Sequence, residues 1–116
     1  MASVKRKSFS DMACPIAQSL EILGEWWTPL ILRDTVLFGI TRFDELQNKL
    51  GIAPTVLTDR LHKLVEHGLL DRRQYSRRPP RFEYVPTQAG RDTEPILNAL
   101  ADWGRRWTEV PEKPTN

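Results

Sequence analysis

The spacing of apolar residues predicts a short helix over residues 41–50. Its apolar stripe consists of Phe43, Leu46 and Leu50. Thr41 and the acidic Asp44 fit a capping box, in which two side chains satisfy backbone amides near the helix start. Gly51 follows directly, as expected for a helix that ends in a left-handed residue. We therefore expect this helix to stop at Gly51.

A second helix is predicted between Ala53 and Gly68. Pro54 suits the first helical position, because the amide hydrogen that proline lacks would be unpaired there in any case. The apolar face consists of Leu57, Leu61 and Leu64. The polar side carries Thr55, Thr58, Asp59 and His62, flanked by Arg60 and Lys63. Two helices joined by so tight a turn are typical of a helix-turn-helix, whose second helix fits a major groove, although an ordinary helical hairpin shares this pattern.

The next segment predicts a basic β-hairpin. Residues 71–75 and 81–85 alternate polar and apolar positions as strands do, and the proline-rich residues 76–80 form the expected tip. The arginines of the hairpin are Arg72, Arg73, Arg77, Arg78 and Arg81, opposed only by Asp71 and Glu83. A charge run is usually a solvated face, but arginine also matches phosphate with two donors and can enter a narrow minor groove. A basic hairpin beside a helix-turn-helix indicates a wing that binds double-stranded DNA.

An ordered set of motifs resembles one known family. The motifs are Cys14-Pro15 and then GEWWTPLILR at 24–33, RFDEL at 42–46, LHKLVEHGL at 61–69, RPPRFEY at 78–84 and TQAGR at 87–91. They resemble the HxlR-type bacterial transcription regulators, winged-helix relatives of the MarR group, from Cys14 to Trp107. The resemblance implies a mainly α-helical fold with a small β-hairpin wing (α+β), and a homodimer that binds a pseudo-palindromic operator and responds to a signal. Pro29 stands where an aliphatic residue is common in the family, but in the first turn of its helix we expect little effect.

The pattern assigns a set of DNA contacts. The residues expected at base edges or adjacent phosphates are Thr55, Thr58 and Arg60. Those expected in the minor groove or on its phosphates are Arg77 and Arg78, and those expected on the backbone are Arg42 and Lys63. Arg81 of the hairpin is also expected to bind DNA.

Helices are also predicted towards both ends of the chain, over residues 15–24 and 27–39, and after Pro86, where Thr87 caps a segment that Pro95 should break or kink. The residues expected at a dimer interface are Ile16, Leu20, Ile96, Leu100, Trp103 and Trp107. In a generic terminal helix such a stripe would only cover the domain's own core. The resemblance favours a symmetric dimer instead, with two recognition helices about one DNA turn apart, roughly 34–36 Å.

A chain of 116 residues fits one domain. We expect an N-terminal arm (1–13), a winged helix-turn-helix domain with terminal dimerisation helices (14–108) and a C-terminal tail (109–116). The net charge of +2 is too small to indicate nucleic acid by itself, but positive charge gathers in the hairpin and at residues 5–7. No stretch resembles a membrane span or a signal peptide, and a single cysteine fits a reducing compartment. We therefore expect a cytoplasmic protein without a membrane partner.

Cys14 is a candidate redox sensor. It precedes Pro15 at an expected helix N-terminus, where unpaired amides and the helix dipole favour a thiolate. The basic residues 5–7 would favour the thiolate further if they folded back towards it. Two alternatives stay open: Cys14 as a small buried hydrophobic residue, and a signal that enters as a small aromatic ligand near the tryptophans.

Motifs of enzymes are missing from the sequence. It contains no Gly-x-Ser-x-Gly, no glycine-rich phosphate loop and no His-Glu-x-x-His. His62 and His67 are five positions apart and do not share a helix face as a metal pair would. We expect no catalysis, no metal and no cofactor. The predicted function is a transcriptional repressor, and the alternative is a winged helix that binds proteins without specific DNA binding.

Overall fold

The two helices predicted from the apolar pattern form the centre of the molecule. In the computed structural model, which describes residues 8–111, α3 spans Phe43–Leu50 and α4 spans Pro54–Glu66. Gly51 has a φ of +65°, and Gly68, just after α4, has a φ of +79°. Both glycines therefore hold the left-handed conformation that ends a helix, as the sequence predicts. Pro54 lies in the first turn of α4.

Helices also form on either side of this pair. Their bounds are Pro15–Leu23 for α1, Thr28–Leu32 for α2, Gln88–Arg91 for α5 and Glu94–Trp107 for α6. The helix predicted over residues 27–39 is not uniform, because α2 continues as one stretch of π-helix, η1, over Arg33–Leu37. The Thr87 hydroxyl accepts a hydrogen bond from the Gly90 amide at 3.2 Å, which confirms the predicted cap. The helical segment breaks between α5 and α6, and Pro95 lies in the first turn of α6.

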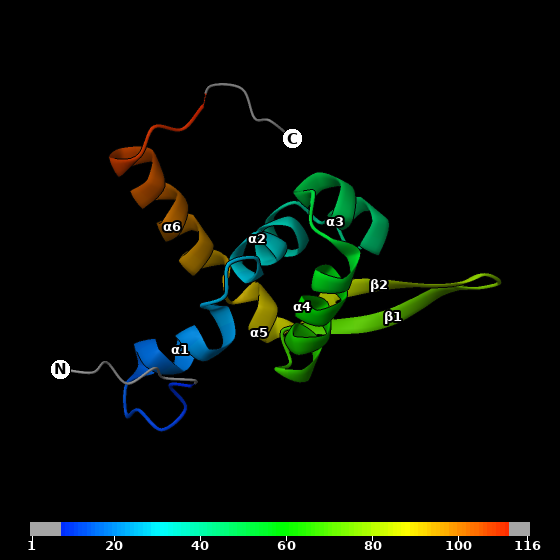
Figure 1. Ribbon diagram of the computed structural model, residues 1–116, viewed down its shortest axis with the longest axis horizontal. Helices are drawn as coiled ribbons and strands as arrows, with labels where there is room; N and C mark the ends of the chain where they lie inside the picture. The colour runs from blue at the N-terminus through cyan, green and yellow to red at the C-terminus, as the bar shows by residue number, and fades with distance from the viewer. Residues whose placement is uncertain (1–7, 112–116) are drawn as a thin grey trace.

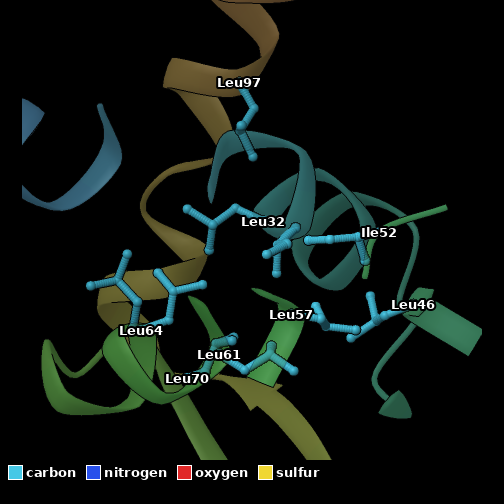
Figure 2. Close-up of a cluster of buried hydrophobic side chains, with 10 residues drawn as sticks. Leu32, Leu46, Ile52, Leu57, Leu61, Leu64, Leu70 and Leu97 are labelled. Carbon is cyan, nitrogen blue, oxygen red and sulfur yellow. The ribbon is translucent and has the colours of Figure 1, made fainter. Parts of the chain in front are cut away.

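The core gathers the leucine faces of α3 and α4 against α2, the start of the hairpin and the first turns of α6 (Figure 2). Its buried members are Ile31, Leu32, Leu46, Ile52, Leu57, Leu61, Leu64, Leu69, Leu70 and Leu97. Leu57 and Leu61 are fully buried and Leu64 is 1% exposed, as their helical spacing predicts. This apolar packing fixes which side of α4 faces outward.

The basic hairpin consists of β1, Leu70–Arg77, and β2, Pro80–Pro86, paired antiparallel. The strands are longer than predicted and the tip is shorter, since Arg77 pairs with Pro80. Proline is tolerated at that position because each strand of a two-stranded sheet is an edge strand. The register shifts between Gln74 and Ser76, so Tyr75 lies in a bulge, which increases the twist of the hairpin.

The predicted capping box at Thr41 is wrong. α3 begins at Phe43 with Arg42 as its N-cap, and no side chain caps it. Thr41 instead adds a short edge to the hairpin: its carbonyl accepts from the Tyr84 amide at 2.8 Å and its hydroxyl donates to Glu83 at 3.2 Å. Contact with a strand distant in sequence thus takes the Thr41 hydroxyl that a local cap would have used.

Two ends of the molecule can be distinguished in Figure 1. The hairpin extends to one side beyond α4, whereas α1 and α6 lie on the other side and α6 projects away from the core. Within residues 8–111, no helix has both the length and the apolar character needed to cross a bilayer. The basic residues 5–7 and the last five residues of the expected tail lie outside the described residues.

Candidate nucleic-acid interface

The outer face of α4 carries polar side chains that bond within the helix itself. The Thr58 hydroxyl donates to the Pro54 carbonyl at 2.8 Å. Lys63 lies 3.3 Å from Asp59, and His62 lies 2.9 Å from Glu66. Thr55, Thr58, His62 and Lys63 are all exposed. These side chains leave the outer face of α4 open to a partner.

Arg60 departs from this arrangement. Sequence reasoning grouped it with the residues that face DNA, but its side chain is only 24% exposed and its Nε lies 2.8 Å from Glu25 Oε1. Glu25 belongs to the loop between α1 and α2, so Arg60 connects α4 to another part of the fold. Asp59 holds the other end of the guanidinium. In this structure Arg60 is a bridging residue rather than a free donor.

The charges around Arg60 are stabilised in their ionised forms. Burial by itself would raise the pKa of Glu25, but hydrogen bonds from Arg60, Trp27 and Thr28 outweigh it and hold the pKa below its usual range. The hydrogen bond to Glu25 raises the pKa of Arg60. A hydrogen bond from Lys63 and the nearby Arg60 lower the pKa of Asp59. The three groups are therefore charged at neutral pH.

The hairpin presents its arginines partly on aromatic rings. The Arg72 guanidinium lies 3.7 Å from the centre of the Phe82 ring, and Arg42 lies 4.5 Å from the centre of the Tyr75 ring. Such stacking restricts a long side chain while leaving its N–H groups free at the ring edge. From the sequence, Arg72 is one of the hairpin arginines but has no assigned DNA contact, and Tyr75 is not a candidate. The interleaving of arginine and aromatic residues along the strands was the signal that could have found them.

Arg77, Arg78 and Arg81, the remaining predicted wing contacts, are exposed. Arg81 also borders a hollow of about 370 Å³ whose other walls include Thr58 of α4, Phe43 of α3 and Tyr75 of β1. The hollow shows that the outer face of α4 and the hairpin adjoin. The structure therefore brings one predicted contact of the helix, Thr58, and one of the wing, Arg81, to the same hollow.

No group of three or more His, Cys, Asp and Glu side chains that could hold a metal ion occurs within residues 8–111. His62 pairs with Glu66 of its own helix. The side chains on the surface of α4 and the hairpin that could contact a partner include hydroxyls, arginines and lysine.

Comparison with known proteins identifies this arrangement. The sequence pattern described as HxlR-like helix-turn-helix matches residues 22–112. The chain belongs to the HxlR-like helix-turn-helix family. An uncharacterized HTH-type transcriptional regulator of Mycobacterium tuberculosis is 46% identical over 99 residues, which are 85% of this chain. The chain spans 62% of the length of that mycobacterial relative.

Solved structures share the fold of this HxlR-like chain. PA1607, a candidate transcription factor, superposes with a TM-score of 0.80 at 36% identity, covering 91% of this chain and 73% of PA1607. The redox regulator HypR in its oxidized form superposes with a TM-score of 0.75 at 31% identity, covering 84% of this chain and all of HypR. The winged helix-turn-helix predicted from the sequence is thus confirmed.

The residues predicted for the dimer interface of this HxlR-like protein lie exposed at the end opposite the hairpin. Their exposed fractions are Ile16 72%, Leu20 47%, Ile96 45%, Leu100 55%, Trp103 62% and Trp107 68%. Ile16, Leu20, Ile96 and Leu100 line an apolar groove of about 490 Å³ between α1, α2 and α6. The stripe therefore does not cover the domain's own core, which was the alternative expectation for a terminal helix.

Cys14, the candidate redox sensor, is the N-cap residue of α1 and carries a free thiol. It is half-buried, so it is neither a core residue nor fully exposed. The segment before it packs on α1, because the Gln18 amide donates to the carbonyls of Ser10 at 2.9 Å and Met12 at 2.8 Å.

Proposed function

We propose that this HxlR-like protein is a transcriptional regulator that binds a pseudo-palindromic DNA operator as a homodimer. The observation that carries the proposal is the hollow that Thr58 of α4 and Arg81 of the arginine hairpin line together. An exposed helix with hydroxyl and cationic side chains fits a major groove, and an adjoining basic hairpin fits the neighbouring minor groove and its phosphates. A bound dimer covers promoter DNA, so repression is the expected outcome.

The contacts divide by chemistry. Thr55 and Thr58, near the N-terminus of α4, are assigned to base edges, since that end of a recognition helix enters the groove first. Arg77 and Arg78 are assigned to the minor groove and its phosphates. The residues assigned to the phosphate backbone are Arg42, Lys63 and Arg81. Arg60 is not assigned to base edges, because it already pairs with Glu25.

Salt dependence tests DNA binding against the alternative of a protein-interaction module. Affinity for a random 30-base-pair duplex is measured by fluorescence anisotropy over a range of KCl concentrations. Phosphate contacts release counterions, so the logarithm of the affinity should fall steeply as salt rises, with a slope of roughly −0.9 for each phosphate contacted. A flat salt response, or no binding at low salt, contradicts the proposal and favours the protein-interaction module.

We also propose that Cys14 senses oxidants or electrophiles. Cys14 is a half-buried free thiol at the N-terminus of α1, and HypR, a structural relative, is named a redox regulator. The sequence has a single cysteine, so a disulfide at Cys14 would be intermolecular or with a small thiol. Diamide should release the wild-type protein from DNA and leave Cys14→Ser bound. Equal release of both proteins would assign the signal to another site, such as an aromatic ligand in the apolar groove.

A further inference from the structure

Glu25 holds two elements of the fold at once, one with each carboxylate oxygen. Oε2 accepts from the backbone amides of Trp27 at 2.8 Å and Thr28 at 3.0 Å, and from the Thr28 hydroxyl at 3.0 Å. These bonds cap the N-terminus of α2. Oε1 lies 2.8 Å from Arg60 Nε on α4. Glu25 therefore fixes α4 to the corner between α1 and α2.

The bond to Glu25 restrains α4 in a way that its apolar face does not. Leu57, Leu61 and Leu64 bury against the core, but hydrophobic contact is non-directional and tolerates a small rotation or slide of the helix. The polar side chains Thr58, His62 and Lys63 bond within α4 and do not tie it to other elements. The Arg60 ion pair joins α4 to the loop between α1 and α2 at one point on the side of the helix, so it opposes the small rotation and slide that the apolar face tolerates.

Accurate placement matters at this helix because base readout needs donors and acceptors within hydrogen-bond range of particular atoms. A recognition side chain must be held to within about 0.5 Å of its working position by groups around it. Thr55 and Thr58 have short side chains and cannot compensate for a displaced helix. A side chain that fixes the position of α4 therefore influences base recognition without contacting DNA itself.

We propose that Glu25 and Arg60 act as a positioning pair that orients the recognition helix α4, and that Arg60 does not itself read a base. This inference rests on the proposed DNA-binding function. The two roles of Arg60 predict opposite effects of removing Glu25. If Arg60 read a base, removal of Glu25 would free its side chain for DNA. If the two residues are a positioning pair, removal of either one lowers sequence-selective binding.

The experiment begins with a duplex selected by the wild-type protein from a random-sequence library, compared with an unselected duplex. Glu25→Gln keeps one oxygen to cap α2 but places an amide group against Arg60. Arg60→Gln removes the other partner, and the double variant combines both changes. Asp59→Asn is the matched control, because Asp59 also contacts Arg60 but does not connect α4 to Glu25's loop.

A positioning pair predicts that Glu25→Gln and Arg60→Gln each weaken binding to the selected duplex about threefold relative to the unselected one, the size expected for the loss of one partly exposed ion pair. The double variant should be no weaker than either single variant. Asp59→Asn should strengthen binding to both duplexes alike, because it removes a negative charge. If Glu25→Gln keeps full selectivity while Arg60→Gln loses it, Arg60 reads a base and the inference is overturned.

Amide hydrogen exchange of the free protein tests the positioning role without DNA and without the Glu25→Gln variant. A positioning pair predicts faster exchange of the α4 amides in Arg60→Gln than in the wild type, with β1 and β2 unchanged. Unchanged exchange in α4 overturns the inference. Failure of the wild-type protein to select any duplex contradicts the proposed function instead, and the exchange measurement still decides whether Arg60 positions α4.

Discussion

Gly90 shows how closely single residues are fitted in this fold. It is buried in α5, where a Cβ atom would lie 2.2 Å from the Leu69 carbonyl oxygen. That oxygen already accepts a hydrogen bond from the Thr87 amide at 3.0 Å, so it cannot move away freely. The absence of a side chain at position 90 lets α5 pack on the start of the hairpin.

We expect Gly90→Ala to lower the free energy of unfolding by about 1–3 kcal/mol, because an added methyl group must displace backbone in a packed region. Urea unfolding followed by circular dichroism measures the loss. Gly104→Ala in α6 is the matched control, since the nearest atom to its Cβ would be Thr108 Oγ1 at 3.9 Å. Alanine should stabilise that helix slightly. Equal stability of Gly90→Ala and wild type would contradict the predicted close approach.

Glu25 should also contribute a pH-dependent part of stability. Its pKa is lowered in the folded state by bonds from Arg60, Trp27 and Thr28, which outweigh the opposing effect of burial. A lowered pKa stabilises the fold above the unfolded value of about 4.3, and this stabilisation is lost as the pH falls through the folded value. Asp59, which shares Arg60, has a lowered pKa as well and is unchanged in the comparison.

The stability difference between wild type and Glu25→Gln should therefore be constant above about pH 5.5 and shrink below the usual glutamate pKa. The ionised form should contribute about 0.5–1 kcal/mol, because the side chain is one-third exposed and solvent screens the pair. Urea denaturation at intervals from pH 3 to pH 7 measures it. Parallel stability curves for the two proteins over that whole range would show that the Glu25 charge does not contribute.

Among the elements, the hairpin combines a packed base with an arginine-rich end. Leu70 is buried at its start, Tyr75 adds a bulge, and Arg72 stacks on the Phe82 ring. Arg42, from the short edge formed with Thr41, stacks on Tyr75. These contacts hold side chains of the hairpin and of the neighbouring edge against one another, and the exposed arginines at the end of the hairpin are the proposed phosphate contacts.

We expect Arg77→Ala and Arg78→Ala each to weaken binding to all duplexes alike and to reduce the salt slope by about 1, if each side chain contacts one phosphate. Anisotropy titrations at several KCl concentrations measure both effects. Arg105→Ala is a suitable control, because Arg105 is exposed on α6 and pairs with Asp102, away from the hairpin. If a wing variant keeps the salt slope of the wild type, the substituted arginine does not contact a phosphate.

At the scale of the whole molecule, basic and apolar surfaces occupy opposite ends. In Figure 1 the hairpin extends to one side beyond α4, and α1 and α6 lie on the other side. The hairpin and α4 present cations and hydroxyls, whereas α1 and α6 line the apolar groove and α6 carries two exposed tryptophans. The polar side chains on the groove wall are already bonded within the chain: Ser19 donates to the Pro15 carbonyl at 2.8 Å and Thr93 to the Gly90 carbonyl at 2.6 Å. Such a surface suits an apolar partner, and a second copy of the chain is the proposed one.

We expect Trp103→Glu to convert a dimer into a monomer at micromolar concentration, because a charge would be buried without a partner at the interface. Sedimentation equilibrium measures the mass. Affinity for the selected duplex should fall much more than affinity for random DNA, since one half-site contributes less than two. Phe38→Glu changes an exposed aromatic residue outside the proposed interface and should leave the dimer intact. A wild-type protein that sediments as a monomer would contradict the dimer.

Much of this protein follows from its sequence because local patterns specify its elements. The leucine spacing of α4 sets which face is buried, and Gly51 and Gly68 mark helix ends because left-handed backbone favours glycine. The alternation of strands, the prolines and the clustered arginines likewise predict the wing. These signals involve residues that are close in sequence, so they can be recognised without knowledge of the fold.

Tertiary structure decided the pairings between distant segments. Thr41, a plausible cap by sequence, bonds instead to Glu83, 42 positions away. Arg60 has the position of a recognition residue in the helical pattern, but Glu25 of a different element holds it. Periodicity determines which way a side chain points from its own helix, whereas its partner depends on which other segment the packing brings within a few ångströms.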